Sequence, residues 1–598
     1  MSEQINVNEL RLQLYNATLK LNKLNLFEAA KWCAEALNGL SKHSNDLQPQ
    51  PQTSIEIDEL QDQEKFILAQ TYFNCKEFER CACVLENSIS GDAKFLRLYS
   101  LMIALDKRAT EESDGLIIAA PISESNLLDT NYNSNDYDQM KTENQSSISN
   151  SKYTKILIES EEYLSHKENA FLFYLNGLIY RKKKKVNDAI NNLYQSLLLF
   201  PYNWSCWREL IDSFVNYEEA YNFIQRVKKK NERFADSPMF HFFEIVVLQE
   251  SHQRSNRLLD LMDRMSSLFP KFTFLQIQNF LIANNHLDYY TAENIFDQIL
   301  IEDPLRLEDL DLFSNMLYVM EKKSKLSYIA AFASNLDPFR CETCLVLGNY
   351  YSLKSEHEKA IMYYKRALIL NKTCLSAWTL MGHEFVELKN SHAAIESYRR
   401  AVDINPKDFR AWYGLGQAYE VLDMHLYALY YYQRATNLQP LDKRMWQAIG
   451  NCYDKIDQLE DAIKSFEKAL AIGKISTDSN VDVGSMGEQT HMKKISINDD
   501  ESDFMVEPHI CYRLALLSEK LHNVEGTRKY MQLCFNQELD WGISDETSKA
   551  RLWLAKDALE QGNFDEAYDL AKDLNHSNAH DVEEARAIAR DARNRIKK

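Results

Sequence analysis

Small, aromatic and polar residues return along the chain with a long, constant period. The pattern is clearest between Cys341 and Ala471, where the same spacing of residue types occurs four times. Three tryptophans there stand 34 residues apart, and glycine and alanine positions keep the same register. The aligned positions are Trp378, Trp412 and Trp446, then Gly348, Gly382, Gly416 and Gly450, then Ala360, Ala394, Ala428 and Ala462.

This spacing is typical of the tetratricopeptide repeat (TPR), in which two antiparallel helices form one unit. We expect each small residue to lie where two helices approach closely, with an aromatic residue beside it. Pro406 and Pro440 end the second helix of their units, because proline has no N–H to continue a helix. The pattern therefore predicts an all-α fold, a TPR superhelical solenoid of about 13–14 helix pairs with two disordered insertions.

Breaks in the register predict the domain boundaries. Two stretches rich in serine, asparagine, aspartate and glutamate lack the periodicity and have too little apolar surface to order themselves. The predicted order is degenerate TPR units at 1–106 with a loop at 41–58, a disordered insertion at 107–151, middle units at 152–340, the best-matching units at 341–473, a disordered acidic insertion at 474–506, C-terminal units at 507–578, and a capping helix at 579–598.

Composition narrows the kind of partner. The 69 Lys and Arg residues against 88 Asp and Glu residues give a net charge of −19, which argues against nucleic acid and suits basic peptides. No apolar run approaches the roughly 20 residues that span a bilayer, and the first residues lack a signal pattern, so we expect an intracellular protein without a membrane partner.

The sequence offers little that resembles catalytic chemistry. Cys341 and Cys344 form a lone C-x-x-C pair, but Cys344 takes the place that Trp378 fills one repeat later, and no second pair completes a zinc site. No phosphate-binding, hydrolase, metalloprotease or kinase motif is present. We therefore predict no catalytic residues, metal or cofactor, and a binding protein instead of an enzyme. The basic run Arg181–Lys185 is read as a solvated turn, with a nuclear-import signal as the alternative.

A polar ladder is expected on the concave face of the best repeats. The residue after each repeat glycine can hydrogen-bond the backbone of an extended peptide, and carboxylates one turn further on can pair with an arginine. The alternative is that these positions are polar only because they meet water. The predicted partner-peptide groove consists of Asn349, His383, Gln417 and Asn451, edged by Glu387, Glu420 and Asp454.

Several longer strings are more specific than the TPR consensus. They resemble the TPR subunit 8 family of the anaphase-promoting complex, also called the cyclosome, with the closest likeness between Asp337 and Lys455. The strings are Gly348-Asn349-Tyr350-Tyr351-Ser352-Leu353, Ala377-Trp378-Thr379-Leu380-Met381-Gly382-His383-Glu384, Arg410-Ala411-Trp412-Tyr413-Gly414-Leu415-Gly416-Gln417, Leu429-Tyr430-Tyr431-Tyr432 and Ala30-Lys31-Trp32.

The resemblance implies a non-catalytic scaffold subunit of an E3 ubiquitin ligase that ubiquitinates mitotic regulators and drives the cell cycle. It implies a homodimer through the N-terminal half, contacts with other subunits including related TPR subunits, and recruitment of propeller-type coactivators through a short basic motif. It also implies a nuclear location, with the cytoplasm as a second compartment. None of these properties follows from composition or periodicity.

The alternative is a TPR co-chaperone or another peptide-binding adaptor. A co-chaperone captures acidic C-terminal tails and needs a clamp rich in lysine and arginine on the concave face. Among the groove positions of the best repeats, Arg410 and Arg444 have that charge, and Glu387, Glu420 and Asp454 oppose it. The sequence favours the ligase scaffold.

Overall fold

A computed structural model of the chain describes residues 7–40, 57–112, 152–214, 217–250, 256–286, 288–440, 442–477, 507–538, 542–572 and 579–596. Helices are the regular structure throughout these ranges, which contain no strand. The all-α TPR prediction is confirmed. The chain divides into two compact units, Met1–Lys325 and Leu326–Lys598.

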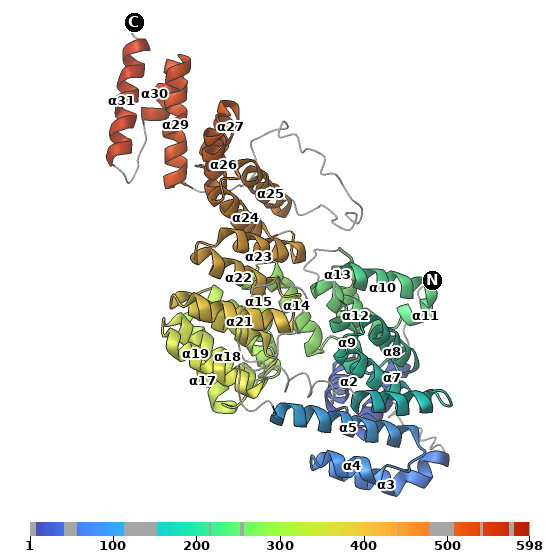
Figure 1. Cartoon of the computed structure of the whole chain (residues 1–598). Helices are drawn as coiled ribbons and strands as arrows, with labels where there is room; N and C mark the ends of the chain where they lie inside the picture. Colours follow the sequence, from blue (N-terminus) through green and yellow to red (C-terminus); the bar gives the residue numbers. More distant parts are fainter. Residues whose placement is uncertain are drawn as a thin grey trace. The chain divides into compact units, whose positions relative to one another are not determined.

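In the first unit many helices pack against the next helix along the chain (Figure 1). A further helix covers residues 152–164. The labelled helices are α1 (Val7–Lys23), α2 (Phe27–Gly39), α3 (Ile57–Asn74), α4 (Phe78–Val84), α5 (Gly91–Glu112), α7 (Ala170–Lys182), α8 (Val186–Leu199), α9 (Trp204–Ser213), α10 (Tyr217–Lys230), α11 (Glu232–Ala235), α12 (Pro238–Glu250), α13 (Asn256–Leu268), α14 (Thr273–Asn285), α15 (Tyr289–Glu302) and α16 (Leu310–Val319).

The second unit contains the regular repeats, and α17 crosses its boundary. Its helices are α17 (Lys323–Leu336), α18 (Cys341–Leu353), α19 (His357–Leu370), α20 (Leu375–Glu387), α21 (Ser391–Ile404), α22 (Phe409–Val421), α23 (His425–Leu438), α24 (Lys443–Lys455), α25 (Leu459–Thr477), α26 (Pro508–Lys520), α27 (Val524–Asn536), α29 (Asp545–Gln561), α30 (Phe564–Lys572) and α31 (Ala579–Ile596).

Helix continues beyond the expected starts of both insertions, because α5 extends to Glu112 and α25 to Thr477. The remainder of the predicted insertions, residues 113–151 and 478–506, lies outside the described residues, as do residues 41–56 of the predicted loop. Among the described residues, no helix has the length and apolarity that crossing a membrane requires.

A residue with a left-handed backbone conformation follows the end of the first helix in each regular repeat. These residues have φ between 54° and 63°, and the amide of the next residue donates to a carbonyl five positions earlier, for example Glu356 N to Tyr351 O at 3.0 Å. This is the hydrogen bond of a Schellman motif, although no glycine is used. The residues stand 34 apart, at Glu321, Ser355, Lys389, Asp423 and Asp457.

The tryptophan and the terminating residue of consecutive repeats are hydrogen-bonded. The indole N–H of Trp412 donates to the carbonyl of Pro406 at 2.9 Å, and Trp446 donates to Pro440 at the same distance. A helix end leaves carbonyls without partners, and the indole of the next helix satisfies one of them. Trp378 donates to Lys372, which takes the place of proline in that repeat.

Each repeat glycine lies against an aromatic ring of the second helix. A Cβ atom added at Gly382, Gly416 or Gly450 would lie within 3.0 Å of Tyr398, Tyr432 or Phe466 respectively. Gly348 faces Tyr364 in the same way. The repeat alanines pack without exposure beside these rings, so the helices of each pair approach as closely as the sequence pattern predicts.

In the first unit, Trp32 of α2 is the centre of an aromatic cluster. Its ring stacks on Trp204 with centroids 4.6 Å apart, and it meets Phe242, Phe272 and Phe274 edge-on at 5.2–5.7 Å. These contacts join α2 to the starts of α9 and α14 and to α12, which lie far along the sequence. The N-terminal helix pair is therefore part of the core of this unit.

Substituting Gly416 by leucine should destabilise the fold by roughly 1–3 kcal/mol or more, because the side chain overlaps the Tyr432 ring. Thermal unfolding followed by circular dichroism measures the effect. The same substitution in a Tyr432→Ala background should cost less, and equal costs in the two backgrounds would show that the ring is not the obstacle.

Replacing Trp32 by alanine should cost about 3–5 kcal/mol, since it removes the centre of a buried aromatic cluster. Phe27→Ala on the same helix provides the control, because Phe27 is 55% exposed. A fall in melting temperature confined to Trp32→Ala is expected. Equal melting temperatures for the two variants would contradict the assigned packing.

Candidate partner-binding surface

The predicted ladder lies on the first helices of four consecutive repeats, α18, α20, α22 and α24. Each ladder residue follows the glycine that contacts the second helix, so the glycine contact fixes its place. The four positions differ in exposure and in hydrogen bonding.

Asn349 differs most from its predicted role. Its side chain is 1% exposed, and its Oδ1 accepts a hydrogen bond from the Tyr364 hydroxyl at 2.7 Å. The amide therefore satisfies a buried hydroxyl of its own repeat and does not face a groove. This corrects the expectation that all four ladder residues are available to a peptide.

The His383 side chain is exposed only in part, and the Tyr398 ring packs against one side of it edge-on. The Tyr398 hydroxyl lies 2.9 Å from His383 Nδ1. Desolvation by the surrounding protein, and then the Arg410 guanidinium, lower the pKa of His383 to about 4. The imidazole is neutral at pH 7 and presents a polar edge without a charge.

In the third repeat the tyrosine hydroxyl goes to the acidic edge. Tyr432 donates to Glu420 at 2.6 Å, and burial together with this carboxylate raises the pKa of Tyr432. Gln417 is half-buried and hydrogen-bonded to Tyr413. Glu420 can still accept a further hydrogen bond, because a carboxylate has about four lone-pair positions.

The fourth repeat has Phe466 in place of tyrosine, so no hydroxyl reaches the half-buried Asn451 from this ring. Asp454 pairs with Lys520 of α26 at 2.6 Å. Glu387, on α20, is exposed. The expected acidic edge therefore consists of an exposed carboxylate, one bonded to a tyrosine, and one already paired with a lysine.

One polar cluster was not anticipated. The buried carboxylate of Glu384 accepts from the Ser352 hydroxyl at 2.6 Å and lies 2.8 Å from His357 Nδ1. The hydroxyl donates to the carboxylate instead of the imidazole, so this is not the nucleophile–base arrangement of a hydrolase. It ties α18 and α19 to α20. The only sequence signal is the residue type, since Ala418 and Cys452 occupy the position of Glu384 in the next two repeats.

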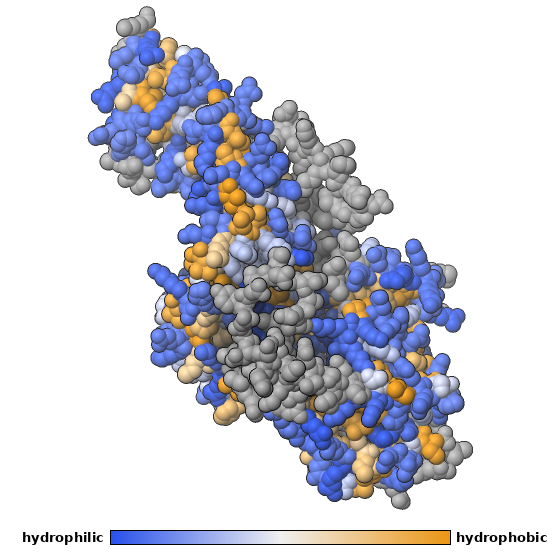
Figure 2. Space-filling view, in the orientation of Figure 1, coloured by the Kyte–Doolittle hydropathy of each residue, from blue (hydrophilic) through white to orange (hydrophobic). Residues whose placement is uncertain are grey.

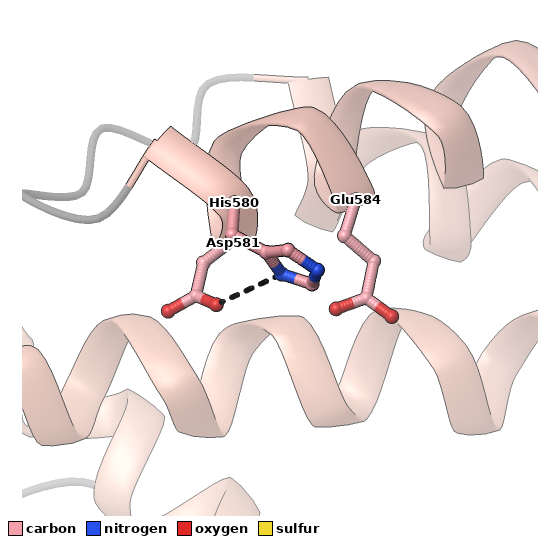
Figure 3. Close-up of side chains that lie close together, drawn as sticks. All are labelled: His580, Asp581 and Glu584. Atoms are coloured by element: carbon pink, nitrogen blue, oxygen red, sulfur yellow. Dashed lines mark ion pairs between the residues drawn. The ribbon is translucent and has the colours of Figure 1, made fainter.

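The cysteines are thiols without disulfides. Cys344 is buried, which raises the pKa of its thiol, and Cys341 is half-buried. Among the described residues, one group of side chains lies close enough together to hold a metal ion: His580, Asp581 and Glu584, at the start of α31 (Figure 3). Glu584 pairs with Lys556 at 2.7 Å, and a metal would have to displace this lysine.

Comparisons with known proteins agree with this architecture. A family model described as anaphase promoting complex subunit 8 / Cdc23 matches residues 9–280. Models of the TPR repeat match residues 342–374, 382–422 and 443–472. The chain is 39% identical to the anaphase-promoting complex subunit CDC23 of Saccharomyces cerevisiae, with 98% of each chain covered.

Subunit 8 of the Arabidopsis thaliana complex is 34% identical over 64% of this chain and 66% of its own. The chain is also similar in fold to a chain in a crystal structure of the APC/C hetero-tetramer Cut9-Hcn1, with 15% sequence identity and a TM-score of 0.48. The match covers 90% of this chain and 97% of that one. Fold and repeats define a TPR scaffold. By its full-length similarity, the chain belongs to the anaphase-promoting complex subunit 8 / Cdc23 family.

Proposed function

We propose that the protein is a non-catalytic TPR scaffold subunit of the anaphase-promoting complex, the E3 ubiquitin ligase that acts on mitotic regulators. The observation that carries the proposal is 39% identity to a named subunit of this complex over 98% of both chains. The repeat geometry supports it, because stacked helix pairs present long surfaces to other subunits. The proposed site of action is the nucleus.

Affinity purification of the full chain followed by mass spectrometry tests the proposal. A cullin subunit, a RING subunit and related TPR subunits should be recovered together. Recovery of chaperones alone would favour the co-chaperone alternative and overturn the assignment.

The proposal includes a homodimer formed through the N-terminal half, which rests on the family resemblance. Sedimentation equilibrium of the full chain at micromolar concentration should give twice the monomer mass. A strictly monomeric species would remove this part of the proposal and leave the subunit assignment in place.

His383 on α20, Gln417 on α22 and Asn451 on α24 form a surface that we call the polar wall. The proposal assigns it a partner, the short basic motif of a propeller-type coactivator. Its support is the hydrogen-bonding character of His383, Gln417 and Asn451 and the exposed carboxylate of Glu387. A charged partner would gain about 1.5–3 kcal/mol per charge-assisted contact if the contact is desolvated on binding, and far less if it stays wet.

Replacing Asn451 and Asp454 together by alanine should weaken the binding of an arginine-containing coactivator peptide without altering helical content. Fluorescence anisotropy with the full chain measures the affinity. Lys520→Ala is the matched control, because it frees Asp454 from its ion pair and should tighten binding. Unchanged affinity in both variants would mean that this part of the wall is only solvated surface.

A further inference from the structure

A second surface lies on the outer face of α19 and is independent of the polar wall. Met362 and Ile369 are 58% and 66% exposed, although both are large and apolar. Phe339, whose ring contacts Arg366 of α19, is 69% exposed. In Figure 2 apolar residues lie among hydrophilic ones where α17–α19 are placed in Figure 1.

The exposed residues of α19 follow the spacing of a helix-packing seam. Glu358, Met362, Lys365 and Ile369 are exposed at successive intervals of four, three and four residues. Alternating steps of three and four keep residues in line with a partner helix, as the a and d positions of a coiled coil do. The two apolar side chains occupy one of these positions, seven residues apart, and the charged ones occupy the other.

Among α17, α19, α21 and α23, only α19 has aliphatic or sulfur-containing apolar side chains at both positions. One repeat later, the residues at the positions of Met362 and Ile369 are Glu396 and Asp403, which are exposed and charged. On α17 and α23 the first position is an exposed tyrosine, Tyr328 or Tyr430, and the second is an exposed asparagine. The repeat therefore does not require apolar residues at both positions. Met362 and Ile369 line one surface hollow together with Ile361 and Lys365, and exposed apolar residues gathered in this way mark an interaction site.

The charge on the seam selects the partner. Lys365 lies between Met362 and Ile369, and the Arg366 guanidinium beside it stacks 4.9 Å from the Phe339 ring centroid. Lys359 is already paired with Glu356 at the start of the helix. The middle of the seam is therefore basic, whereas the protein as a whole has a net charge of −19.

We infer that the outer face of α19 is a docking site for an amphipathic acidic helix of a partner protein. The partner's apolar residues pack against Met362 and Ile369 with Phe339 at one edge. Its acidic residues face Lys365 and Arg366. Charge alone does not make a second copy of this acidic chain a better partner than such a helix. Self-association is therefore measured as one outcome of the test.

The test uses the full chain and a fluorescein-labelled model helix of three heptads, with leucine at a and glutamate at d. A matched helix with lysine at d serves as the second probe. The glutamate helix should bind about tenfold more tightly or better. Met362→Ser combined with Ile369→Ser should weaken its binding by about tenfold or more.

Lys365→Glu should reverse the preference between the two helices. Glu396→Ser with Asp403→Ser, at the same repeat positions of α21, is the control and should bind like the parent. Circular dichroism verifies folding of each variant. Equal binding of both helices, or binding unaffected by the Met362 and Ile369 changes, overturns the inference. A loss of self-association in the variant with Met362→Ser and Ile369→Ser would also overturn the inference, because it would assign the face to a second copy.

Discussion

The structure depends on the contact between a glycine of one helix and an aromatic ring of the next within each regular repeat. The ring of Tyr364, Tyr398 or Tyr432 occupies the space that a Cβ atom would need. The same contact places the ring's hydroxyl against a polar residue of the first helix, which is Asn349, His383 or Glu420. Core packing and the polar wall are therefore set by the same side chains.

The sequence predicts those features of the fold in which this glycine–ring contact recurs. The fold class, the helix pairing and the terminating role of Pro406 follow from a register that returns every 34 residues. The availability of the wall could not be predicted, because it depends on which way a hydroxyl points. Tyr398 and Tyr432 occupy the same repeat position, yet the hydroxyl of one lies beside His383 and the hydroxyl of the other donates to Glu420.

The N-terminal unit was harder to predict for a different reason. Trp32 packs against residues from Trp204 to Phe274, and a pattern of local periodicity says nothing about such distant partners. The family model matches residues 9–280, whereas the sequence strings pointed mainly to residues 337–455. The family is thus defined by irregular helices that the generic repeat does not describe.

The bond between Glu384 and its two donors limits how this array of repeats can change. A gain or loss of one 34-residue unit leaves the glycine contacts intact, because each regular repeat has its own glycine and ring at the same positions. The polar contacts of Glu384 on α20 would not survive such a change. Removing the preceding unit would replace Ser352 and His357 by Tyr318 and Lys323. The larger tyrosine would have to fit where a serine is buried, and a carboxylate without good partners is costly to bury. The identity of the preceding unit therefore matters at this boundary, whereas the glycine contacts alone would accept any regular repeat.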